Sequence, residues 1–253
     1  APHEIEFGYK ATYRPQNFGH SFSGRDVTLR EALVRSLNVV TVDAAMQAGL
    51  GSVAEMAEKL GLPRPQAYPS MALGASEATP LELAGAYTAF ANDGIKTTPF
   101  AIRSIKAQGE VLHSGEAEKA GVLSGSLAYL VTDALKDVVN RGTAARIRTL
   151  GYHGPAAGKT GTSRDAWFVG YTPKLLVAVW VGYDDNRDLG LTGGEAAVPI
   201  WADFVNAALA VRPDLRASEF ARPGGLQEME LCADSGLLAS EYCPHRQKMV
   251  LAA

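Results

Sequence analysis

Residues 156–183 read AAGKTGTSRDAWFVGYTPKLLVAVWVGY, and this stretch decides the fold. Its β-branched and aromatic residues fall into three short runs, which predict strands at 156–163, 166–171 and 175–183. Only a three-residue turn separates the last two runs, so we expect those strands to be antiparallel neighbours. The third run is apolar at every position except Gly182, which is typical of a central strand covered on both faces.

Helical patterns come before and after this stretch. Capping residues and apolar periodicity predict one helix that begins at Thr28 and further helices at 52–60, 80–92, 127–140 and 198–209. We expect the last helix to pack on the sheet through Ile200, Phe204 and Val205. Helices first and antiparallel strands later indicate an α/β fold of the α+β layered kind, an antiparallel sheet flanked by helices.

The remaining segments carry weaker patterns. Residues 101–107 and 110–113 predict a peripheral hairpin that turns at Gln108-Gly109. Residues 1–25 and the segment after Pro213 show no sustained period, and we expect both to be irregular.

A break is expected in the helix that begins at Thr28. Residues 39–42 are Val-Val-Thr-Val, and β-branched side chains are mildly unfavourable in helices, which favours a break near Ser36 to Asn38. In a continuous helix two residues two positions apart point about 200° apart, so Ser36 and Asn38 could serve one site only across such a break. The alternative is that Ser36 is a small residue on the apolar stripe and Asn38 caps the next helix.

The motif Gly158-Lys159-Thr160-Gly161-Thr162-Ser163 carries the most specific chemistry. A phosphate-binding loop would need four residues between its two glycines and a helix directly afterwards, and this segment has neither. On a strand, Thr160 and Thr162 project to one face and present two hydroxyl donors to a carboxylate, while Gly161 lets a substrate approach the strand edge. Lys159 supplies a positive charge but points to the opposite face, so its ammonium must reach round the strand or through the gap between layers. The alternative is a lysine that faces solvent beside threonines that merely favour a strand.

Composition excludes several classes of function. The 253 residues include 24 basic and 27 acidic side chains, with no run of like charge, which argues against binding to nucleic acid or anionic lipid. The longest apolar run has nine residues, whereas a membrane helix needs about 20. The two cysteines, Cys232 and Cys243, are compatible with a disulfide or with two thiols, and their spacing does not suggest a metal site.

Taken in order, several motifs together resemble the transpeptidase domain of a class A penicillin-binding protein. They include Val27 to Leu33 leading into Ser36-Leu37-Asn38, Ala72-Leu73-Gly74 followed by Thr79 to Leu83, Arg141-Gly142-Thr143, Gly158 to Ser163, Asp165 to Tyr171, and Trp180 to Asp185. The resemblance implies a serine β-lactamase/transpeptidase-like fold for residues 1–211 and a separate tail at 212–253 that carries the two cysteines.

The resemblance also implies a function and roles for individual residues. The intact domain would be a D,D-transpeptidase that cross-links peptidoglycan stem peptides by serine acyl transfer, binds β-lactam antibiotics and needs no cofactor. Ser36, Asn38 and Lys159 would be catalytic, and the substrate's carboxylate would be bound by the four residues Thr160, Gly161, Thr162 and Ser163. Such a protein would work outside the cytoplasm, anchored to the membrane through a segment upstream of this chain, with cell-wall synthesis proteins as possible partners.

The family's nucleophile is the serine of a Ser-x-x-Lys motif, and no serine in this sequence is followed by lysine three positions later. We therefore expect the N-terminal part of the domain to lie before Ala1 and this chain alone to be inactive. Two alternatives remain at this stage: a recognition module of the same fold that binds peptides without turnover, and a D,D-carboxypeptidase or β-lactam hydrolase that passes the acyl group to water.

Overall fold

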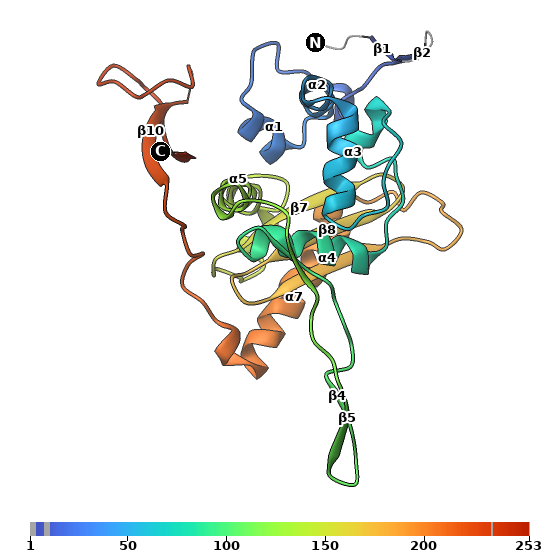
Figure 1. The fold of residues 1–253 in the computed structure, drawn as a ribbon. Helices are drawn as coiled ribbons and strands as arrows, with labels where there is room; N and C mark the ends of the chain where they lie inside the picture. The colour runs from blue at the N-terminus through green and yellow to red at the C-terminus, as the bar shows by residue number, and fades with distance from the viewer. Residues whose placement is uncertain (1–3, 8–10, 234, 253) are drawn as a thin grey trace.

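A three-stranded antiparallel sheet lies at the centre of the computed structural model, which describes residues 4–7, 11–233 and 235–252 (Figure 1). The strands are β7 (Ala157–Thr162), β8 (Ala166–Tyr171) and β9 (Leu176–Val181), in the order β7-β8-β9. The three predicted strands and their antiparallel pairing are confirmed. The prediction that residues 175–183 form the central strand is wrong, because β8 is central and β9 lies at the edge of the described sheet.

Helices cover both faces of this sheet. Helices α4 (Pro80–Ala91) and α5 (Gly125–Arg141) pack against one face and α7 (Gly193–Val211) packs against the other (Figure 1). Side chains of β8 alternate accordingly: Tyr171 contacts Tyr87 of α4 and Thr132 of α5, whereas Phe168 contacts Trp201 of α7. The apolar run in β9 reflects this double cover, since both α4 and α7 pack against it. The expected sheet flanked by helices is therefore confirmed.

The core on the α7 face is built around Trp201, which is fully buried. Its ring packs edge-on against Phe168 and Tyr152, and its Nε1 donates to the carbonyl oxygen of Gly170 at 3.1 Å. A Cβ at Gly170 would lie 2.5 Å from the Phe168 ring, so β8 needs glycine at this position. Two aromatic rings and one hydrogen bond therefore fix the position of the indole.

Helix α7 begins five residues earlier than the sequence predicted. Thr192 and Glu195 form a capping box at its start, and Pro199 lies inside the helix. The prediction that Ile200 and Phe204 pack on the sheet is wrong, since they are 50% and 53% exposed, while Val205 is buried as expected. The buried face of α7 is instead the one that carries Val198, Trp201, Ala202 and Val205.

The expected break near residue 36 is confirmed. Helix α1 (Leu29–Arg35) ends at Ser36, and α2 (Asn38–Ala48) begins two residues later, followed by α3 (Leu50–Lys59). The other described elements are β1 (Ile5–Phe7), β2 (Ala11–Tyr13), β3 (Ile95–Thr97), β6 (Lys119–Gly121), α6 (Arg146–Thr149) and the 3-10 helices η1 (Phe18–His20), η2 (Pro69–Leu73) and η3 (Pro213–Leu215).

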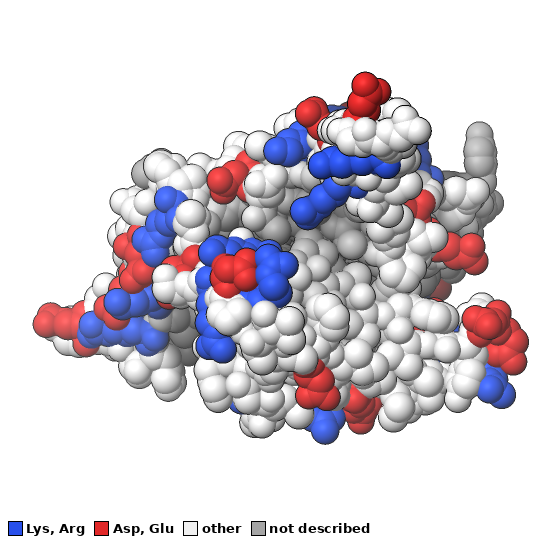
Figure 2. Space-filling model, turned by 90° about the horizontal axis from the view of Figure 1, so that it is seen from below, with Lys and Arg blue, Asp and Glu red and all other residues white. Residues whose placement is uncertain are grey.

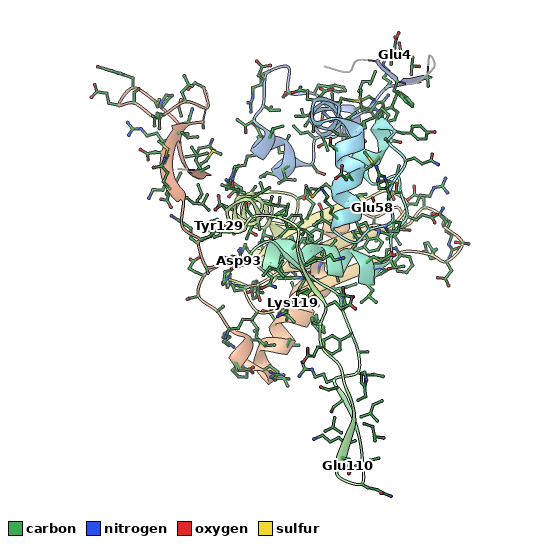
Figure 3. All side chains as sticks on the ribbon, in the orientation of Figure 1. Glu4, Glu58, Asp93, Glu110, Lys119 and Tyr129 are labelled. Atoms are coloured by element: carbon green, nitrogen blue, oxygen red, sulfur yellow. The ribbon has the colours of Figure 1, made fainter. Side chains whose placement is uncertain are left out.

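Two hairpins stand apart from the central layers. The predicted peripheral hairpin forms from β4 (Ser104–Ala107) and β5 (Glu110–Ser114), is exposed throughout, and carries Glu110 near its tip, far from the sheet (Figures 1 and 3). A second hairpin pairs β10 (Leu226–Cys232) with β11 (Arg246–Ala252). The expectation of an irregular chain is therefore wrong for β10 and β11 in the C-terminal segment and for β1 and β2 in the N-terminal segment. Residues 1–3, 8–10, 234 and 253 of these two segments lie outside the described residues.

Charged side chains of opposite sign lie next to one another on the face that Figure 2 shows, with an uncharged area beside them. Among the residues that the structure describes, no helix has the length and apolar character needed to cross a membrane.

Candidate active site

Ser36 lies in the tight turn between α1 and α2. Its backbone is left-handed, with φ 55° and ψ 51°, a conformation that non-glycine residues rarely adopt. The Ser36 N–H donates to Leu33 O and the Leu37 N–H donates to Ala32 O, which is the paired bonding of a Schellman helix end. This helix end, in place of a continuous helix, is what allows the Ser36 hydroxyl to leave the helix surface.

Asn38 is the first residue of α2 and not its cap, because Leu37 occupies the N-cap position. The Asn38 Nδ2 donates to Gln16 O at 2.8 Å. The side chain of Asn17 takes over the capping function, since its Oδ1 accepts from the Val39 N–H at 3.2 Å. The N-terminal segment therefore fixes Asn38 through one hydrogen of its side-chain amide.

Lys159 links the turn at Ser36 to the sheet. Its Nζ donates to Ser36 Oγ at 2.8 Å and to Thr160 O at 2.9 Å, so the ammonium reaches round the edge of β7. Strand β7 is at the edge of the described sheet, and this leaves the space for the lysine to pass. Burial lowers the pKa of Lys159 from 10.5 to about 8, so the charge is held where water screens it poorly.

Thr160 and Thr162 lie on one face of β7, as predicted, and each hydroxyl has a partner. Thr160 is 8% exposed, and its Oγ1 lies 2.6 Å from Thr143 Oγ1. Thr162 is exposed, and its Oγ1 accepts from the Gly193 N–H at the start of α7 at 3.0 Å. A Thr162 hydroxyl that accepts this bond keeps its own proton free to donate.

Gly161 and Ser163 complete the segment. A Cβ at Gly161 would lie 3.2 Å from the Cβ of Trp167 on β8, so the cross-strand neighbour already favours glycine here. Ser163 is exposed just after β7, and its N–H donates to Asp165 O at 3.1 Å, which turns the chain toward β8.

Two residues of the site were missed by the sequence predictions, namely Thr143 and Gly193. Thr143 follows α5, and its N–H donates to Val34 O in the last turn of α1 at 3.3 Å. Gly142 permits this approach, because a Cβ there would lie 2.6 Å from Val34 O. The turn after α5 therefore touches both α1 and β7, the two elements that carry Ser36 and Lys159.

An ion-pair network fixes α1 on α5. Arg30 donates to Asp137 Oδ2 at 2.7 Å and to Asp133 Oδ2 at 2.8 Å, and Arg141 donates to Asp137 Oδ2 at 2.7 Å. Burial alone would raise the pKa of Asp137, but the hydrogen bonds from Arg141 and Arg30 outweigh it, and the net pKa lies below the ordinary value. The helix that ends at Ser36 is thus anchored by charge as well as by packing.

The surroundings of the site hold no candidate metal centre: within residues 4–7, 11–233 and 235–252, no group of three or more His, Cys, Asp or Glu side chains could hold an ion. A pocket of about 370 Å³ lies elsewhere, between Tyr152 and Arg216. Ser36, Lys159, Thr160 and Thr162 lie together along β7, outside this pocket.

The family model described as the penicillin-binding protein transpeptidase domain matches residues 3–206. A curated relative named penicillin-binding protein 1A, from Aquifex aeolicus, is 37% identical over 235 residues, which cover 90% of this chain and 32% of the relative. The chain therefore spans about a third of the length of that relative.

Solved structures match as well. The crystal structure of penicillin-binding protein 1A from Haemophilus influenzae superposes with a TM-score of 0.87 at 26% identity, covering 98% of this chain and 43% of that one. The ceftriaxone acyl-enzyme complex of penicillin-binding protein A from M. tuberculosis has a TM-score of 0.67 at 26% identity, covering 80% of this chain and 53% of that one.

Proposed function

Because this chain belongs to the penicillin-binding protein transpeptidase domain family, we propose that it forms part of a D,D-transpeptidase of the class A type. The longer protein would attack the penultimate D-alanine carbonyl of a peptidoglycan stem peptide, form an acyl-enzyme, release the terminal D-alanine and pass the acyl group to an amine. One observation carries the proposal for this chain: the 2.8 Å contact from Lys159 Nζ to Ser36 Oγ beside the two threonines of β7.

Ser36 would relay a proton to the leaving amine. An ammonium only donates hydrogen bonds, so Lys159 must donate to Ser36 Oγ, and the Ser36 proton then points away from the lysine and into the site. A hydroxyl placed in this way can hand its proton to the departing nitrogen while the lysine stabilises the charge left on its oxygen.

Lys159 would supply the local positive charge. Its pKa of about 8 leaves it mostly protonated at neutral pH. Its burial makes the charge more effective toward a carboxylate or a developing oxyanion than the same charge in water.

Thr160 and Thr162 would hold the terminal carboxylate of the donor peptide, and the Thr162 backbone N–H would donate to the oxyanion. Gly161 and Ser163 would line the same side of the site. Asn38 would accept the donor's amide N–H through Oδ1, while its Nδ2 gives one of its two hydrogens to Gln16 O. Penicillins would enter the same site, because they carry a carboxylate and an acyl carbonyl in a similar arrangement.

The nucleophile would come from a Ser-x-x-Lys segment encoded upstream of Ala1, and the whole protein would act outside the cytoplasm with a membrane anchor in that upstream part. The test is intact-mass measurement after incubation with benzylpenicillin, on the chain of residues 1–253 and on the longer gene product in parallel. We expect a stoichiometric adduct on the longer protein only. An adduct on the 253-residue chain would show that the nucleophile is misplaced, and a longer protein that stays unmodified would refute the proposal.

Transfer and hydrolysis differ only in the acceptor of the acyl group. We propose transfer, and incubating the longer protein with a D-Ala-D-Ala stem peptide, with and without an amine acceptor, tests this choice. A new amide that appears only with the amine is expected. Release of D-alanine with the free acid as the sole product would favour a carboxypeptidase instead.

A further inference from the structure

We propose that Thr143 is a further specificity-determining residue: its hydroxyl donates to Thr160 Oγ1 and so directs the Thr160 proton toward the terminal carboxylate of the ligand. This inference rests on the proposed function, because it takes Thr160 to bind that carboxylate. Thr143 lies outside both short motifs, in the turn that follows α5.

The count of protons leads to this role. The two oxygens, Thr143 Oγ1 and Thr160 Oγ1, lie 2.6 Å apart, so one of the two hydroxyls donates to the other. An ionised carboxylate accepts hydrogen bonds and has no proton to donate. A Thr160 hydroxyl that binds a carboxylate must therefore donate its single proton to that carboxylate. Thr143 then has to be the donor within the pair.

Thr162 has a similar arrangement, with a backbone group in place of a hydroxyl. Its Oγ1 accepts from the Gly193 N–H at 3.0 Å, and its own proton stays free. The site thus offers two hydroxyl protons from residues two positions apart on one strand face, one for each carboxylate oxygen. Each of these hydroxyls is oriented by a donor behind it.

The backbone of Thr143 is held in place independently of its side chain. Its N–H bonds to Val34 O, Gly142 packs against α1 without room for a Cβ, and a Cβ at Gly194 would lie 2.9 Å from Thr143 O. Replacing the Thr143 hydroxyl by a methyl group therefore leaves the turn supported. Thr143 is exposed, whereas Thr160 is only 8% exposed, so a substitution at Thr143 changes a surface residue and does not open the core.

Acylation rates of the longer gene product test the inference, with benzylpenicillin and its methyl ester as probes. The Thr143→Val variant should react about three- to ten-fold more slowly with benzylpenicillin, the size expected for the loss of one neutral hydrogen bond, here the one that orients Thr160. Its reaction with the ester, which has no carboxylate charge, should stay within about two-fold of wild type. Thr143→Ser keeps the hydroxyl and should restore the rate.

Thr149→Val is the matched control, because Thr149 is also exposed and its hydroxyl bonds only to Arg146 O within α6. It should leave both rates unchanged. Equal slowing of both probes by Thr143→Val would mean a structural role and would overturn the inference, as would wild-type rates with both. A wild-type protein that reacts with neither probe would overturn the proposed function, and this inference with it.

Discussion

Replacing Lys159 with methionine is expected to change how the free energy of unfolding depends on pH. The Lys159 ammonium is buried against Ser36 and Thr160, and burial lowers its pKa to about 8 from 10.5. In the unfolded chain the same lysine returns to its ordinary pKa. The native and unfolded states therefore bind different numbers of protons over part of the alkaline range.

The sign and size follow from these two pKa values. Below pH 8 both states hold the proton, and above pH 10.5 neither does, so the effect is confined to the interval between them. Within this interval the unfolded state binds more protons, so stability rises with pH. The difference of about 2.5 pKa units corresponds to about 3 kcal/mol, which the wild-type protein gains between these limits and the methionine variant does not.

Urea unfolding at pH 7, 8, 9 and 10 provides the measurement. Taking the difference between wild type and Lys159→Met at each pH cancels the titration of every other group, including the tyrosines. Lys174→Met is the matched control, because Lys174 is exposed and its Nζ donates to Asp214 O at the surface. A wild-type stability that runs parallel to that of Lys159→Met across this range would refute the assignment of the lysine to a buried position.

Three further predictions concern the frame around the site. Ser36→Gly should be about 1 kcal/mol more stable than Ser36→Ala in chemical denaturation, because both lose the hydroxyl but only glycine relieves the left-handed backbone; equal stabilities would count against that conformation. The stability of wild type should fall as pH drops below the ordinary aspartate pKa of 3.8, because the unfolded chain then takes up a proton that folded Asp137, whose pKa is depressed, does not yet bind. The variant Asp137→Asn should lack that part of the acid dependence, and identical acid profiles would contradict it. Trp201→Ala should cost about 3 to 5 kcal/mol in thermal unfolding, since the indole is fully buried and bonded to Gly170 O; a loss below about 1 kcal/mol would show that the core can close around the gap.

Local patterns predicted much of the frame. The break at Ser36 was predicted from the β-branched residues after Asn38 and its location is confirmed, but those residues lie inside α2, and the helix ends at the left-handed backbone of Ser36 instead. The three strands and their pairing followed from short apolar runs joined by turns. The position of β9 at the edge of the sheet was not predicted correctly. An apolar run shows that both faces of a strand are covered, and it does not show how many neighbouring strands pair with it.

The start of α7 was missed for a different reason. Gly193 and Gly194 are poor helix formers, and they conceal the capping box formed by Thr192 and Glu195. The glycines are required by packing, since a Cβ at Gly193 would lie 2.3 Å from Trp167 O. Local propensity therefore gave way to a tertiary contact that the sequence does not display.

The candidate site was only partly accessible to sequence reasoning. Residue types suggested Ser36, Lys159 and Thr160, and strand alternation implied that the Lys159 ammonium would have to reach round β7, but only the structure shows that it meets Ser36 Oγ. Thr143 belongs to one of the motifs that carry the family resemblance, Arg141-Gly142-Thr143, but this motif indicated no role for it in the site, because its contact with Thr160 depends on how α5 docks. The roles of these residues in turnover remain predictions.

The left-handed turn at Ser36 also limits which amino acids can stand there. Serine and threonine are commonly exchanged in proteins because they carry the same functional group, yet a β-branched side chain is strongly disfavoured at a φ of 55°. Threonine would therefore bring the right hydroxyl to a backbone that it cannot comfortably adopt. At residue 36 the backbone conformation therefore disfavours the exchange of serine for threonine, although both side chains carry a hydroxyl group.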